Sequence, residues 1–82
     1  MRAAWRALEL TASLLGKSNR NLVSDLYVAA LNLNACIQAA KFNVLANTPY
    51  LKDREVAEAM EAEANELSAK SIALSAEILA NA

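Results

Sequence analysis

The sequence predicts an all-α fold, an antiparallel three-helix module over residues 1–82 in which two helices are long. Only one Gly and one Pro occur in 82 residues, so few positions interrupt a helix. Hydrophobic residues make up 56% of the chain and aromatic residues 5%, with Ala prominent, and Ala costs least to fix in a helix. Strands are therefore not expected, and the small side chains let neighbouring helices approach closely.

The first helix is expected at about residues 2–15. Its apolar face follows spacings of three and four residues through Trp5, Leu8, Ala12 and Leu15. That spacing is typical of an amphipathic helix. Gly16 fits the left-handed position that ends many helices, so the helix is expected to stop there and a short polar loop to follow.

The second helix is expected at about residues 22–46. Its apolar stripe also alternates spacings of three and four, through Val23, Leu26, Ala30, Leu33, Ile37, Ala40 and Val44. Such a helix is roughly 37 Å long, too long for this chain to cover on both sides. We therefore expect self-association through apolar stripes, into a dimer or larger helical bundle. A second stripe runs through Ala29 and Cys36, and this single cysteine is expected to be a buried, reduced thiol.

A turn at residues 47–50 is expected to separate the second and third helices, because Pro49 lacks an N–H and disfavours helix at the preceding residue. Tyr50 is expected to pack over the helix ends. Asp53 can cap the third helix, which is expected at about residues 53–79. The apolar stripe expected on this helix comprises Val56, Met60, Ala64, Leu67, Ser71, Leu74 and Ile78.

The composition excludes partners of several kinds. The net charge is −1, so no overall positive field attracts the phosphates of nucleic acids. The apolar segment 26–40 is broken by Asn32, Asn34 and Gln38, well short of the roughly 20 apolar residues that span a membrane. Nothing in the sequence marks secretion. We therefore expect a cytoplasmic protein that binds neither nucleic acid nor a membrane.

The chemistry open to the chain is limited by its lack of histidine. Without histidine there is no Ser-His-Asp triad, no Cys-His pair and no His-ligated zinc. Glutamates crowd the start of the third helix, but di-iron bundles combine them with Glu-x-x-His motifs, so we expect a solvated acidic face and no metal site. Glu66 and Lys70 are spaced to form an ion pair on this helix. Catalysis would depend on Asp, Lys or Tyr.

The residue with the clearest chemical potential is Asp25, at the expected start of the second helix. Exposed N–H groups at a helix N-terminus stabilise negative charge, so Asp25 is expected to be a carboxylate at neutral pH. A structural alternative stays open, in which Asn21 or Ser24 is the N-cap and Asp25 only complements the helix dipole.

Asp25 also belongs to a longer pattern. Residues 24–30 read Ser-Asp-Leu-Tyr-Val-Ala-Ala, Asn43-Val44 follows, and Lys52-Asp53 comes after the turn. This order resembles the C-terminal part of the formiminotetrahydrofolate cyclodeaminase and methenyltetrahydrofolate cyclohydrolase family. There an SD-x-x-VAA segment starts a long helix, an Asn-Val pair lies near its end, and Lys-Asp or Arg-Asp follows a short turn. The resemblance covers residues 16–53 well and the last helix in general character.

The resemblance implies an all-α, oligomeric protein that acts on one-carbon units carried by tetrahydrofolate, a substrate rather than a bound cofactor. One reaction closes the formimino group of 5-formiminotetrahydrofolate onto N10 and releases ammonia. The other adds water to the 5,10-methenyl bridge and opens it to 10-formyltetrahydrofolate. Both reactions pass through an amidinium-like cation. The Asp25 carboxylate could stabilise this cation, or it could accept a proton from water beside the cation. The other implied contacts are Ser24, Asn21 and Asn43 to the pterin or the bridge, and Lys17 or Arg20 to the glutamate tail.

Two features of the second helix leave alternatives open. Asn43 lies eighteen residues after Asp25, about 27 Å along a helix, so either a subunit interface unites the two or one of them is structural. A buried Asn32 or Asn34 would fix the helix register or contact the substrate.

Family members also carry, ahead of this region, a Pro-Gly-Gly-Gly-Ser type segment and further helices, which the sequence does not match. We therefore expect a truncated form of the enzyme, with another chain supplying the N-terminal helices. The alternative is a non-catalytic helical oligomerisation module derived from the same family. A requirement for Asp25 in catalysis would distinguish the truncated enzyme from the non-catalytic module.

Overall fold

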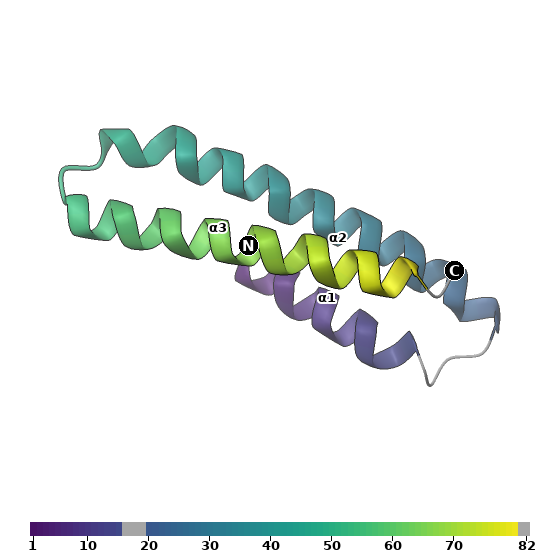
Figure 1. The fold of residues 1–82 in the computed structure, drawn as a ribbon. Coiled ribbons are helices and arrows are strands. Elements are labelled where there is room, and N and C mark those ends of the chain that lie inside the picture. The colour runs from purple at the N-terminus through teal and green to yellow at the C-terminus, as the bar shows by residue number, and fades with distance from the viewer. Residues whose placement is uncertain (16–19, 81–82) are drawn as a thin grey trace.

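The computed structural model describes residues 1–15 and 20–80, with the side chains of all of these except residues 15 and 20–22. This part of the chain is helical and contains no strand: α1 (Arg2–Leu15), α2 (Arg20–Asn47), the 3-10 helix η1 (Thr48–Tyr50) and α3 (Arg54–Leu79). Figure 1 shows α2 and α3 as an antiparallel hairpin, with α1 alongside and antiparallel to α2. The predicted all-α module with two long helices is confirmed. The helix end expected at Gly16 lies outside the described residues.

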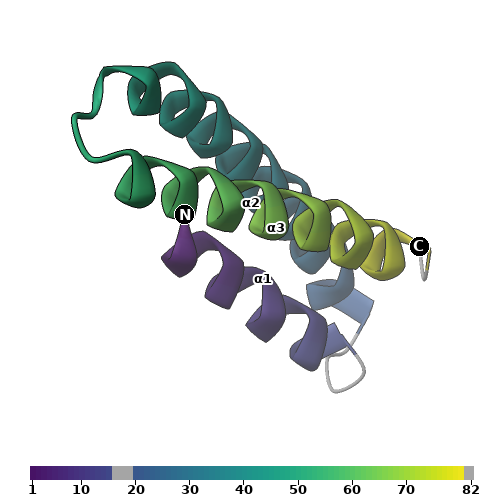
Figure 2. The ribbon, with the colours of Figure 1, turned by 60° about the vertical axis from the view of Figure 1, so that its left-hand side comes forward.

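α1 covers only half of the α2–α3 hairpin. Its 14 residues span about 21 Å, against about 42 Å for the 28 residues of α2. Figures 1 and 2 show α1 displaced towards the start of α2 and the end of α3, with the N-terminus beside the first half of α3, where Met1 lies with Met60 and Ala64. The other half, which ends at η1, is a layer of two helices only. The molecule is accordingly long and thin, 50 × 18 × 15 Å.

The hydrophobic core lies where the three helices meet. It contains Leu8 from α1, Ala30 and Ile37 from α2, and Ile78 from α3, each at most 2% exposed. Every residue of the apolar stripe expected on α2 is buried or half-buried. The stripe is therefore covered within the chain itself, so that any self-association must use a different face.

The apolar stripe expected on α3 is correct in its second part and wrong at its start. Its last five residues, from Ala64 to Ile78, are buried or half-buried. Val56 and Met60 are 48% and 43% exposed, because α1 begins only at the level of Met60, where it leaves a cavity. Ala57 is fully buried there instead.

Hydrogen bonds from side chains hold the turn between the long helices. Thr48 is fully buried and donates from Oγ1 to Glu61 Oε1 at 2.5 Å, while Arg54 Nη1 donates to the Thr48 carbonyl at 3.0 Å. Pro49 lies in this turn, as expected. Tyr50 is 86% exposed, so the prediction that it packs over the helix ends is wrong. The polar Thr48 is the residue buried at this end of the hairpin.

Two polar features predicted for α3 are present. Asp53 is the N-cap, and its Oδ1 accepts hydrogen bonds from the N–H groups of Glu55 and Val56 at 3.0 and 3.2 Å. Lys70 Nζ lies 3.0 Å from Glu66 Oε1, which is the expected pair four residues apart. The cap fixes the start of the helix, whereas the exposed ion pair adds little stability.

Candidate functional site

Asp25 lies further inside α2 than expected from the sequence. Because α2 begins at Arg20, Asn21 and Ser24 are residues within the helix, and the alternative that one of them is the N-cap is wrong. Asp25 comes five residues after Arg20, beyond the first turn and its free N–H groups. The side chains of Ser24 and Asp25 are both exposed.

The structure does not gather the expected substrate-binding residues into one site. Asn21, Ser24 and Asp25 lie within the first two turns of α2, but Asn43 is eighteen residues beyond Asp25, about 27 Å along the helix. Eighteen residues are five full turns, so Asn43 and Asp25 lie on the same side of α2 at opposite ends. Asn43 is exposed as well. Lys17 lies outside the described residues.

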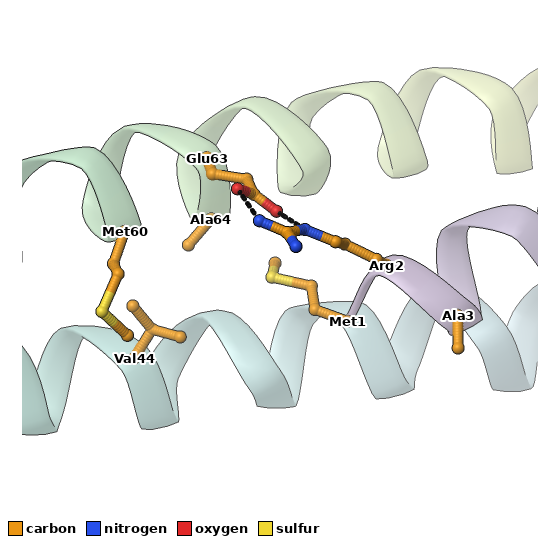
Figure 3. A pocket seen from close by; sticks show the side chains of 7 residues that line it. All are labelled: Met1, Arg2, Ala3, Val44, Met60, Glu63 and Ala64. Atoms are coloured by element: carbon orange, nitrogen blue, oxygen red, sulfur yellow. Dashed lines mark hydrogen bonds and ion pairs between the residues drawn. The ribbon is translucent and has the colours of Figure 1, made fainter. Parts of the chain in front are cut away.

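A cavity of about 380 Å³, not indicated by the sequence, lies where α1 begins against the two long helices. Figure 3 shows the side chains that line it: Met1, Arg2, Ala3, Val44, Met60, Glu63 and Ala64. The cavity forms because α1 starts beside the first half of α3 and leaves the rest of the hairpin uncovered. Its walls are mostly aliphatic and its two charged groups pair with each other, so it suits a small apolar group. None of the residues expected to contact substrate lines it.

An ion pair joins α1 to α3 at the edge of this cavity. Arg2 Nη2 donates to Glu63 Oε2 at 2.7 Å, and Arg2 Nε donates to Glu63 Oε1 (Figure 3). The hydrogen bonds from Arg2 lower the pKa of Glu63, and the attraction between the charges lowers this pKa further. Because the pKa of Glu63 is lowered in the folded chain, the ion pair stabilises the fold at pH values above the pKa that Glu63 has in the unfolded chain. That stability is lost as the pH falls through the folded-state pKa.

We expect Arg2→Gln to return the pKa of Glu63 towards its ordinary value, because the substitution removes both the charge and the hydrogen-bonded fork. The measurement is an NMR titration of the Glu63 side-chain carboxyl carbon. Arg6→Gln, at an exposed position on the same helix, is the matched control and should leave the titration unchanged. Identical Glu63 titrations in wild type and Arg2→Gln would show that the pair does not form.

A polar ladder of four side chains joins α2 to α3. Asn34 Oδ1 accepts hydrogen bonds from Ser71 Oγ at 2.7 Å and from Gln38 Nε2 at 3.1 Å. Gln38 Oε1 accepts from Ser68 Oγ at 2.6 Å, and its Nε2 also donates to the Ser68 carbonyl at 3.2 Å. Ser68 and Ser71 are buried, and Asn34 is half-buried, so Asn34 fits the register-fixing role. Asn32 is exposed and cannot fix the register in this way.

The face of α2 turned to solvent is made of uncharged residues over about 27 Å, and the half-buried Lys41 reaches it with its Nζ, which lies 6.0 Å from the centre of the Phe42 ring. The face consists of all exposed α2 residues between positions 28 and 46: Val28, Leu31, Asn32, Ala35, Cys36, Ala39, Phe42, Asn43 and Ala46. We refer to these nine residues as the outer face. Its largest side chains, Phe42, Val28 and Leu31, are 67%, 55% and 52% exposed. Cys36 is exposed here, so the prediction of a buried thiol is wrong, because the stripe that contains it is not the one covered by α1 and α3.

Sites of two other kinds are absent from residues 1–15 and 20–80. In these ranges no three side chains of Cys, Asp or Glu come together in a way that could hold a metal ion. Over the same ranges, none of the helices has the length and apolar character needed to cross a bilayer.

The arrangement of the helices defines the class of protein as an all-α module built on a long hairpin. The family model described as formiminotransferase-cyclodeaminase matches residues 1–66, which include α1, α2 and the first half of α3. The chain belongs to this family, as its resemblance to the cyclodeaminase pattern predicted. No curated protein and no solved structure matches the chain.

Proposed function

We propose that the chain acts in folate one-carbon chemistry as an incomplete cyclodeaminase or methenyltetrahydrofolate cyclohydrolase. The observation that carries this proposal is the family match over residues 1–66, which contains Asp25 and the whole of α2. The exposed position of Asp25 supports it, because a carboxylate on the surface of a helix is open to a substrate. We also place the protein in the cytoplasm, since its one cysteine has no second cysteine in the chain to pair with.

Asp25 is the residue we propose as catalytic. In hydrolysis, water adds to the cationic 5,10-methenyl carbon and loses one proton, which leaves a hydroxyl on that carbon. The hydroxyl then loses its proton as the bond from carbon to N5 breaks and N5 takes up a proton, which gives the 10-formyl product. In cyclodeamination, N10 attacks the formimino carbon and ammonia leaves. A carboxylate beside this carbon stabilises the cation and can accept the proton lost from water. Ser24 and Asn21, within a turn of Asp25, are proposed to contact the pterin or the bridge.

A complete substrate pocket requires walls that α2 does not provide. Asp25 lies on open surface, whereas a charged transition state is stabilised best where water is excluded. We propose that helices from another chain cover this end of α2. Lys17 would then meet the anionic glutamate tail of the substrate. Asn43 would bind substrate only in a site built from two chains, because it lies about 27 Å from Asp25 in one.

We expect the purified chain, in which a second copy can cover the Asp25 end of α2, to accelerate the hydrolysis of 5,10-methenyltetrahydrofolate, followed by the loss of its absorbance. Asp25→Asn should slow this reaction about 100-fold, the lower end of the usual effect of removing a general base. Glu58→Gln makes the same chemical change at an exposed position on α3 and should keep the wild-type rate. A wild-type rate equal to that of buffer, or equal rates in wild type and Asp25→Asn, would contradict the proposal.

A non-catalytic helical interaction module is the second candidate function, and the uncharged outer face of α2 favours it. Exposed apolar faces of this length mark binding surfaces on helical proteins. For such a module, Asp25→Asn leaves every property of the chain unchanged, whereas substitutions on the outer face alter its association.

A further inference from the structure

We propose that the cavity at the start of α1 binds a small, uncharged aromatic molecule that carries one hydrogen-bond donor. All three helices contribute walls: residues 1–3 at the start of α1, Val44 on α2, and Met60, Glu63 and Ala64 on α3. The inference does not depend on the folate proposal, because none of the residues proposed to contact folate lines this cavity.

The size and the lining of the cavity are those of a site for a small molecule. Its volume of about 380 Å³ lies near the lower end of the range for ligand pockets, roughly 300–1,000 Å³. Ala64, one of the apolar residues that line it, is only 2% exposed, whereas Met60 is 43% exposed. The cavity therefore has a buried apolar wall that a ligand can cover, and it is open to solvent on the side of Met60.

Both methionines of the chain line this cavity. Figure 3 shows Ala64 between their two side chains, with Met60 reaching from α3 towards Val44 on α2. A thioether side chain adapts its shape to a ligand, and its sulfur makes favourable contacts with the edge of an aromatic ring. A flat ring placed over Ala64 would have a thioether at each side. The two methionines therefore favour an aromatic ligand over an aliphatic one of the same size.

The ion pair at the edge of the cavity determines the polar character of the ligand. The charges of Arg2 and Glu63 compensate each other, so the lining offers no unpaired charge to a charged ligand. Arg2 donates one hydrogen bond to each carboxylate oxygen of Glu63, and each oxygen can accept a second one. The guanidinium group can also lie over the face of a ring. An uncharged ring with one hydroxyl or N–H donor suits both groups.

The first test uses the methionine methyl groups as reporters. When these groups are labelled with 13C, the NMR spectrum of the chain has one signal from Met1 and one from Met60, and both report on the cavity. The ligand is benzyl alcohol. The control ligand is cyclohexylmethanol, which has the same skeleton and the same hydroxyl group but a saturated ring. Burial of apolar area alone would favour the control ligand, because it is the more hydrophobic of the two.

Benzyl alcohol is expected to shift both signals in a saturable way, with half-saturation at about 1 mM or below, as efficient binding of so small a ligand requires. It should bind at least about 5-fold more tightly than cyclohexylmethanol, because only the aromatic ring gains from the thioethers and the guanidinium group. The absence of a saturable shift, or an equal or higher affinity for cyclohexylmethanol, overturns the proposal.

The second test locates the binding site with two variants of α3. Met60→Ala removes one of the two thioethers at a position that is 43% exposed, so the helical content should be unchanged while benzyl alcohol binds about 5-fold more weakly. The Met1 signal reports binding in this variant. Val56→Ala is the matched control, because Val56 is 48% exposed one turn earlier and does not line the cavity. Equal affinities in wild type and Met60→Ala, or equal losses in the two variants, overturn the proposal.

Discussion

Ile37→Ala is expected to lower the free energy of unfolding by about 2–5 kcal/mol, the usual cost of removing a large aliphatic side chain from a core. Ile37 is fully buried with Leu8, Ala30 and Ile78, in the core where the three helices pack together. A chain of this size has few other buried apolar residues to compensate, and its total stability is only of the order of 5–15 kcal/mol. The measurement is urea unfolding followed by circular dichroism.

The control for this experiment is Ile72→Ala. It removes the same atoms from a residue that is 54% exposed, so its effect should be much smaller. Both variants are compared at one chain concentration, because association alone changes apparent stability. Equal losses for Ile37→Ala and Ile72→Ala would mean that the core is not where the three helices meet.

Asn34→Leu is expected to destabilise the fold by about 1–3 kcal/mol, although Leu has a similar size and is apolar. The substitution removes the acceptor for Ser71 Oγ, which is fully buried, and for one hydrogen bond of Gln38. A buried hydroxyl that has lost its partner carries an uncompensated desolvation cost. No such cost arises when both residues of the pair are replaced by apolar ones. Adding Ser71→Ala to Asn34→Leu should therefore recover part of the loss.

The free energies of unfolding of the two single variants and the double variant give the coupling energy between positions 34 and 71. Asn65→Leu makes the same change at an exposed position on α3 and should alter stability by no more than about 0.5 kcal/mol. Additive effects of Asn34→Leu and Ser71→Ala would show that the hydrogen bond between Asn34 and Ser71 does not join the two helices.

The sequence allowed the helices of this fold to be predicted, because local patterns determine them. The spacing of three and four residues around Ile37 depends on helix geometry alone, and the stripe it defines is the buried one. Asp53 likewise caps α3 through neighbouring N–H groups, which are local. Local patterns do not determine which parts of a long helix are covered. Val56 and Cys36 were misplaced because their burial depends on where the shorter α1 lies.

The candidate site, like the fold, could be predicted only in part from the sequence. Asp25 was indicated by its place in a family pattern, and it lies exposed near the start of α2. The cavity lined by Met1 and Met60 could not be predicted, since it forms only where α1 starts beside the first half of α3. The hydrogen bonds of Gln38 were also missed, because its partner Ser68 lies thirty residues away in the sequence, on α3.

The central claim is that α2 carries part of a folate site around Asp25. It is tested most directly by an NMR titration of the 15N-labelled chain with 5-formyltetrahydrofolate, a stable compound that resembles the substrates. The claim predicts amide shifts centred on Ser24 and Asp25 that weaken in Asp25→Asn and are unchanged in Glu58→Gln. No shifts at millimolar ligand, or shifts confined to the cavity around Met1 and Met60, would contradict it.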